Sequence, residues 1–182
     1  ARLAICPVIV SASRATDVPA FFAPWLMERI QDGYTLWRNP FNGTLSQVSF
    51  SKTRLFVFWS KHPAPLIRKL KQLDDLGYHY YFQYTLNDYV AEGWEPGLPS
   101  LEDRIDTFMQ LSELIGKEKV IWRCDPLILS STLGTERLIE RIARLGERLH
   151  PYTERLVFSF VDIDGYRRVR SRLARLDQAI RP

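Results

Sequence analysis

Polar side chains follow several apolar segments of this chain, at the points where we expect strands to end. In a parallel α/β sheet the carboxyl ends of the strands lie at one edge, and ligands bind there. Guanidinium, ammonium and hydroxyl donors are the groups that hold phosphates and carboxylates in proteins. We therefore expect a small polar or anionic ligand to be bound by Ser11, Ser13, Arg14, Arg38, Asn39, Lys61, Gln83 and Arg123.

Two aspartates in the same positions are candidate catalytic residues, Asp17 and Asp125. Asp125 would orient Arg123 or act as a base, because alternation along an extended strand places both side chains on one side. The alternative is that these two residues pair for a purely structural reason. For Asp17 the alternative is helix capping, and for Arg38 with Asn39 it is an exposed turn before proline.

The sequence offers little for nucleophilic or metal chemistry. His62 could act as a general base, but a lone histidine on a loop more often has no such role. Cys6 and Cys124 belong to no Cys-x-x-Cys unit, and no clustered His/Cys set with zinc spacing is present. We therefore expect no metal site, and a buried thiol is the simpler interpretation of Cys124.

Apolar segments of strand and helix type alternate along the chain. The pattern predicts parallel strands at 5–11, 34–38, 54–60, 78–86, 119–124 and 155–161, with a short hairpin strand at 45–50. Helices are expected at 19–30, 65–76, 100–116, 135–149 and 165–180, with a loop over 87–99. To Glu92 and Glu95, in that loop, we assign no catalytic role.

This alternation predicts an α/β fold with a parallel sheet and right-handed crossovers. An open doubly wound sheet and a closed barrel both fit it. No Gly-x-Gly-x-x-Gly follows the first strand, which argues against a dinucleotide-binding fold. A complete eight-unit barrel takes roughly 250 residues. We therefore expect one domain over residues 1–182, a partial TIM-like (β/α) barrel of about six parallel strands with outer helices.

Composition excludes several classes of protein. Hydrophobic residues are 46% and charged residues 25%, as in ordinary globular domains. No apolar run approaches the roughly 20 residues that cross a bilayer, and the start of the chain before Pro7 is too short for a signal peptide. Two cysteines make no disulfide framework. We expect a cytoplasmic protein with no membrane partner.

The net charge of +4 is concentrated near the end of the sequence. Residues 165–182 contain six arginines and a single acid, Asp177. A solvated helix face is one interpretation. The other is a patch that binds phosphates, which would make the chain a nucleic-acid-associated module.

Several strand-end segments resemble the bacterial family called Domain of Unknown Function 1848. They are Val10–Phe21, Arg38–Asn42, Val57–Pro63, Phe82–Leu86, Val120–Pro126 and Phe158–Asp162, in the same order. The chain departs from the family pattern at Ala15, where a second basic residue is usual, and at Cys124, where an aromatic residue is usual.

The resemblance implies a cofactor that the printed residues alone cannot hold. Members of the family carry a C-terminal cysteine cluster like that of radical S-adenosylmethionine enzymes, whose thiolates ligate a 4Fe–4S cluster. This chain has no such cysteines. The resemblance therefore implies that the native protein extends past Pro182 with at least one more βα unit and the cluster. The chain would then be the substrate-binding part of a radical-SAM-like enzyme.

Overall fold

The structure is a computed structural model that describes residues 4–12, 16–161 and 180–181. Two compact units divide the chain, residues 1–84 and 85–182. The expected mixed α/β fold is confirmed: five strands form one sheet in the order β1-β4-β5-β6-β8, with helices between them in sequence. The pairs β1–β4, β4–β5 and β6–β8 run parallel.

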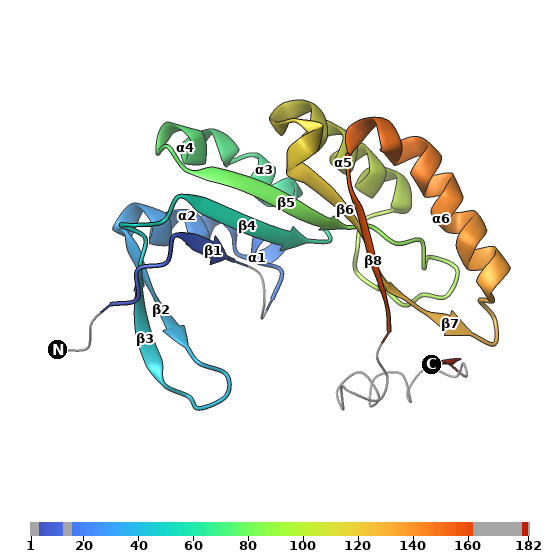
Figure 1. Ribbon diagram of the computed structural model, residues 1–182, viewed down its shortest axis with the longest axis horizontal. Helices are drawn as coiled ribbons and strands as arrows, with labels where there is room; N and C mark the ends of the chain where they lie inside the picture. The colour runs from blue at the N-terminus through green and yellow to red at the C-terminus, as the bar shows by residue number, and fades with distance from the viewer. Residues whose placement is uncertain (1–3, 13–15, 162–179, 182) are drawn as a thin grey trace. The chain divides into compact units, whose positions relative to one another are not determined.

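The first unit holds three of these strands and four short helices (Figure 1). The strands are β1 (Ile9–Ser11), β4 (Leu55–Ser60) and β5 (His79–Thr85), the last of which reaches the boundary with the second unit. The helices are α1 (Val18–Phe21), α2 (Ala23–Asp32), α3 (Ala64–Ile67) and α4 (Leu70–Asp75). Aromatic rings of β4 and β5 fill its core, with the Phe58 and Phe82 ring centroids 5.1 Å apart.

One predicted strand of the parallel sheet is placed elsewhere. Residues 34–38 form β2 (Tyr34–Arg38), which pairs antiparallel with β3 (Leu45–Ser49) in a separate two-stranded sheet (Figure 1). The hairpin partner was expected, but the assignment of 34–38 to the parallel sheet is wrong. The close turn between the strands brings β3 alongside β2 in the antiparallel direction. The parallel sheet therefore has five strands, and the described residues do not close a barrel.

The second unit contains β6 (Val120–Leu127), β7 (Leu129–Ser130), β8 (Leu156–Phe160) and β9 (Ile180–Arg181). Its helices are α5 (Leu101–Ile115) and α6 (Thr135–Leu149), with 3-10 turns η1 (Lys117–Lys119) and η2 (His150–Tyr152). The predicted helix over 165–180 lies almost entirely outside the described residues. No helix in the described part of the chain is long and apolar enough to cross a membrane.

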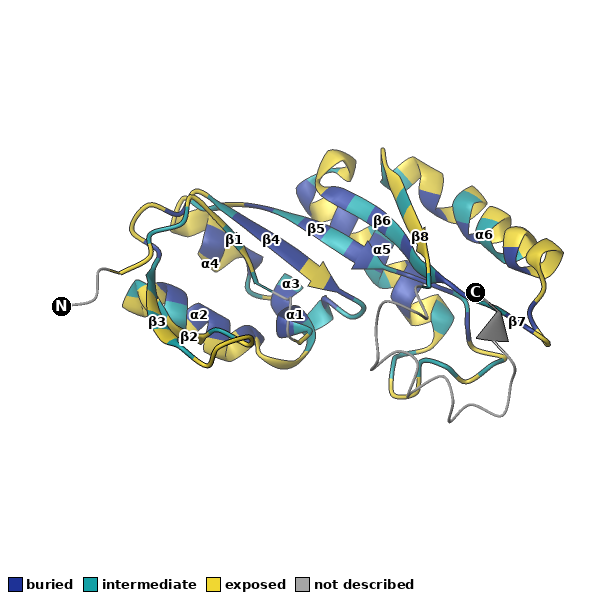
Figure 2. Cartoon of the chain, turned by 60° about the horizontal axis from the view of Figure 1, so that its bottom comes forward, coloured by how far each residue is buried: buried dark blue, intermediate teal, exposed yellow. Residues whose placement is uncertain are grey.

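The burial pattern of β6 defines two faces (Figure 2). Val120, Trp122 and Cys124 are buried, together with many of the apolar residues of α5 and α6. The residues between them, Arg123 and Asp125 among these, are only partly buried. Because side chains alternate along a strand, the two charged residues share the opposite face of β6.

Candidate functional site

An ion pair stands on the partly buried face of β6, near the carboxyl end of the strand. The Nε atom of Arg123 donates to Oδ2 of Asp125 at 3.1 Å, and Nη2 contacts the same oxygen. The Ser159 hydroxyl, from the neighbouring strand β8, donates to Oδ1 of Asp125. We call Arg123, Asp125 and Ser159 the strand-end cluster. Its two charged members lie on one side of the strand, as the alternation predicts.

The charged groups of this cluster are largely withdrawn from water. The Arg123 side chain is 14% exposed and the Asp125 side chain 20%. Their neighbours on the same face, Ile121 and Val157, are apolar and partly buried. The ion pair agrees both with an orienting role of Asp125 toward Arg123 and with a purely structural pairing.

Side chains of the segment after β5 hold the end of β6 in place. The Asn87 Nδ2 group donates to the Asp125 carbonyl at 3.2 Å. The Tyr89 hydroxyl donates to the Pro126 carbonyl at 2.7 Å and accepts from the Ile128 amide at 3.2 Å. Neither Asn87 nor Tyr89 is among the residues predicted from the sequence, because both contacts depend on how the loop runs along β6.

Asn87 carries an unmet hydrogen-bonding group. The residue is 2% exposed, and its Oδ1 atom has no partner among the described residues. The carbonyl of Asp125 can only accept, so it fixes the amide with Nδ2 toward β6. A buried acceptor without a donor costs about 1–3 kcal/mol. The strand end therefore retains hydrogen-bonding capacity that this chain's described residues do not use.

Ion pairs with both long helices anchor the segment that carries Asn87. Arg104 of α5 is buried and contacts the Asn87 carbonyl at 3.2 Å and Glu95 at 3.3 Å. Arg141 of α6 binds both carboxylate oxygens of Glu92. The two glutamates left without a role in the sequence are thus the anchors of the loop, since Glu92 is 4% exposed and Glu95 11%.

Cys124 lies between the two charged residues but faces the core. Burial raises the pKa of its thiol to about 12, and the charge of Asp125 adds to the effect. A thiol with such a pKa stays protonated at neutral pH and is a poor nucleophile. The buried-thiol interpretation is therefore the one that the structure supports.

The described residues do not fit the iron–sulfur cluster that the family resemblance implies. A 4Fe–4S cluster needs several thiolates together. Cys124 is buried in the second unit and Cys6 belongs to the first. Within residues 4–12, 16–161 and 180–181, no three His, Cys, Asp or Glu side chains gather as a metal site. We derive no reaction step through such a cluster.

In the first unit, the predicted site residues have mainly structural contacts. Asp17 Oδ1 accepts from the Ala20 amide at 3.1 Å and caps α1, while Oδ2 accepts from the Lys61 amide at 2.8 Å. Asp17 and Lys61 are therefore adjacent, at the carboxyl end of β4. Ser11 ends β1 opposite Val57. Ser13 and Arg14 lie outside the described residues.

The remaining candidates of this unit do not join Asp17 in one cluster. Arg38 donates to the Gly43 carbonyl at 3.3 Å, and Asn39 Oδ1 accepts from the Phe41 amide at 2.9 Å, so both belong to the β2–β3 turn. The exposed-turn alternative is the better description of this pair, because β2 is not a strand of the parallel sheet. Gln83 is partly buried on β5, opposite Trp59 of β4.

Fold and site together define an α/β protein with a parallel sheet and a polar cluster at the carboxyl end of its strands. The family model described as Domain of unknown function (DUF1848) matches residues 9–181. The chain belongs to this family. The comparisons found no curated protein and no solved structure that is similar to it.

Proposed function

We propose that the strand-end cluster is the binding site for a polar small molecule. The observation that carries the proposal is the ion pair of Arg123 with Asp125, which is largely withdrawn from water and accepts a hydrogen bond from the exposed Ser159 hydroxyl. The carboxyl ends of parallel strands are where α/β proteins bind ligands. We also assign the sheet to a partial TIM-like barrel, since strand–helix alternation supports that finer description.

The cost of removing charge from water argues against the idea that the Arg123–Asp125 pair exists mainly to stabilise the fold. Removing two charges from water costs several kcal/mol per ion, and their mutual attraction often only balances that cost. An apolar pair of similar volume would pack against Ile121 and Val157 without the penalty. The presence of a largely buried charge pair at this end of the sheet therefore supports a binding role.

The charges of the cluster also limit the class of ligand. Arg123 and Asp125 neutralise each other, so the cluster favours a polar or zwitterionic molecule over one with a large net negative charge. The Ser159 hydroxyl adds an adaptable donor and acceptor. An amino acid or a small hydroxylated molecule has this chemistry.

The experiment that tests the proposal is an NMR titration of the ¹⁵N-labelled chain. L-serine serves as a zwitterionic probe, glycerol as a neutral one and glycerol phosphate as an anionic one. We expect the zwitterion or the neutral probe to shift amide signals of β6 and β8 near Arg123 and Ser159. The Asp125→Asn variant, which breaks the charge pair with little change in size, should abolish the shifts.

A matched control uses an ion pair at the opposite ends of the same strands. Lys117 precedes β6 and Glu154 precedes β8, and their side chains are 3.5 Å apart and exposed. Glu154→Gln should leave every titration unchanged. Shifts that persist in Asp125→Asn, or that disappear equally in Glu154→Gln, would show that the cluster is not the binding site.

A further inference from the structure

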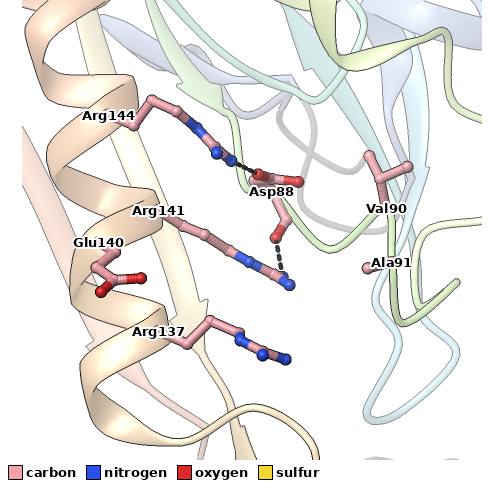
Figure 3. Close-up of a pocket in the computed structure, with 7 residues that line it drawn as sticks. All are labelled: Asp88, Val90, Ala91, Arg137, Glu140, Arg141 and Arg144. Atoms are coloured by element: carbon pink, nitrogen blue, oxygen red, sulfur yellow. Dashed lines mark hydrogen bonds and ion pairs between the residues drawn. The ribbon is translucent and has the colours of Figure 1, made fainter.

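Helix α6 carries arginines at spacings that place them on one face. Arg137, Arg141 and Arg144 follow one another at i, i+4 and i+7. All three side chains extend from the helix toward the loop that contains Asp88 and Val90 (Figure 3). Between helix and loop lies a cavity of about 450 Å³, within the range of small-molecule sites. This cavity belongs entirely to the second unit.

Two of the arginines are held in place by acidic residues. Arg141 binds Glu92 through two hydrogen bonds, of 2.7 and 2.9 Å, and donates to the Asp88 carbonyl at 2.8 Å. Arg144 binds the Asp88 carboxylate at 2.5 Å. Groups that are fixed before a ligand arrives lose less entropy when it binds. The wall of the cavity is thus organised in advance.

Arg137 differs from the other two. Its guanidinium donates to the Thr132 carbonyl at 3.4 Å, and no carboxylate among the described residues lies within ion-pair distance of it. Glu140 also lines the cavity, but its side chain stays beside the helix while the arginines extend away from it (Figure 3). Among the described residues, Arg141 is therefore paired with Glu92 and Arg144 with Asp88, whereas Arg137 has no carboxylate partner.

We propose that this cavity binds a small organic acid with a single carboxylate. The carboxylate would form a two-pronged pair with Arg137, whose planar fork matches its geometry. The carbon skeleton would lie against Val90 and Ala91, the apolar side of the cavity. One carboxylate is enough for the one arginine of the lining that has no carboxylate partner among the described residues. The inference is independent of the proposed function, because it uses no member of the strand-end cluster.

The test is an NMR titration with benzoate, and with benzamide as its uncharged counterpart of the same shape. Benzoate at millimolar concentration should shift the amide signals of Val90, Ala91 and the first turns of α6, and benzamide should not. Arg137→Gln should weaken benzoate binding by about tenfold or more, as expected when a charge-assisted pair is lost. Arg137→Lys keeps the positive charge but not the planar guanidinium group. Its affinity for benzoate should therefore lie between those of wild type and Arg137→Gln.

Arg148→Gln is the matched control, because Arg148 lies on the same helix and binds Glu102 away from the cavity. It should leave the affinity within about twofold of wild type, since exposed pairs contribute little. The proposal is overturned if benzoate causes no shifts, if benzamide binds equally well, or if Arg137→Gln binds like wild type. Tighter binding of inorganic phosphate than of benzoate would overturn the assignment to a monocarboxylate.

Discussion

The side chains of Arg123, Cys124 and Asp125, which are neighbours on β6, lie in different surroundings. Arg123 and Asp125 keep their charges on one face of β6, while the Cys124 thiol faces the core and burial raises its pKa to about 12. The thiol pKa is 9.0 without that environment. Above pH 9 the unfolded chain therefore releases a proton that the folded chain retains.

This difference gives a pH dependence with a definite sign. Because the native state binds more protons than the unfolded state between about pH 9 and 12, stability must fall as pH rises through that window. Between the two thiol pKa values, each pH unit lowers the free energy of unfolding by about 1.4 kcal/mol. We expect Cys124→Ala to have a flatter stability profile than wild type in urea unfolding from pH 8 to 10.5. Parallel profiles would contradict the burial effect.

Asp17 provides a second prediction for a single residue. Asp17→Ala removes the cap of α1 and the acceptor for the Lys61 amide, and should destabilise the protein by about 1–2 kcal/mol. Asp17→Asn keeps one carbonyl oxygen and should lose less. Urea unfolding at neutral pH measures both variants. Equal stability of Asp17→Ala and wild type would mean that these contacts contribute nothing.

The sequence predicts those parts of the site that depend on one strand. Alternation alone places Arg123 and Asp125 together, and this pairing is present. Ser159 joins them only because β8 lies beside β6 in a particular register, with Arg123 opposite Val157. The role of Asn87 depends on how a loop folds back along β6. Register and loop path depend on distant contacts, so the local pattern does not contain them.

Two largely buried ion pairs, Arg104–Glu95 and Arg141–Glu92, join the loop after β5 to the helices α5 and α6. Arg104 is 2% exposed and its partner Glu95 nearly as buried. Arg104→Met would leave the Glu95 carboxylate without this partner, a change that costs about 3 kcal/mol in buried pairs. We expect faster hydrogen exchange at the amides of residues 87–95.

A double variant separates charge from packing in this loop. Arg104→Met combined with Glu95→Leu removes both charges and should restore much of the protection. Arg148→Met, at an exposed ion pair between α6 and α5, should leave exchange in residues 87–95 unchanged. Exchange that is unaffected by Arg104→Met would show that other contacts hold the loop.

The two longest helices, α5 and α6, lie close to the ranges that the sequence predicts for them. Ser100 accepts from the Asp103 amide at 3.1 Å, and α5 begins at the next residue. α6 spans the predicted range. The single helix expected over 19–30 is instead two, because the chain leaves helical geometry at Phe22 and α2 begins anew with Pro24 in its first turn. The hairpin position of β2 was not predictable from its own apolar pattern.

The distribution of charge along the whole chain suggests a second function, nucleic-acid binding, that can be tested. The arginine-rich segment 165–182 lies almost entirely outside the described residues, and nucleic-acid binding through it stays a prediction. Binding to a DNA duplex should weaken steeply with salt and be lost when Arg167, Arg168, Arg170 and Arg172 are replaced by glutamine. Salt-dependent fluorescence anisotropy measures this, and binding that survives the replacement would reject the role of the segment.

We propose that the charges of the strand-end cluster serve binding rather than stability. The most direct test is the free energy of unfolding of the double variant Arg123→Met with Asp125→Leu, measured in urea at neutral pH. Because apolar pairs of similar volume often replace ion pairs without loss of stability, we expect the double variant to be as stable as wild type or more stable. A double variant less stable than wild type by more than about 2 kcal/mol would contradict it, since the pair would then stabilise the fold itself.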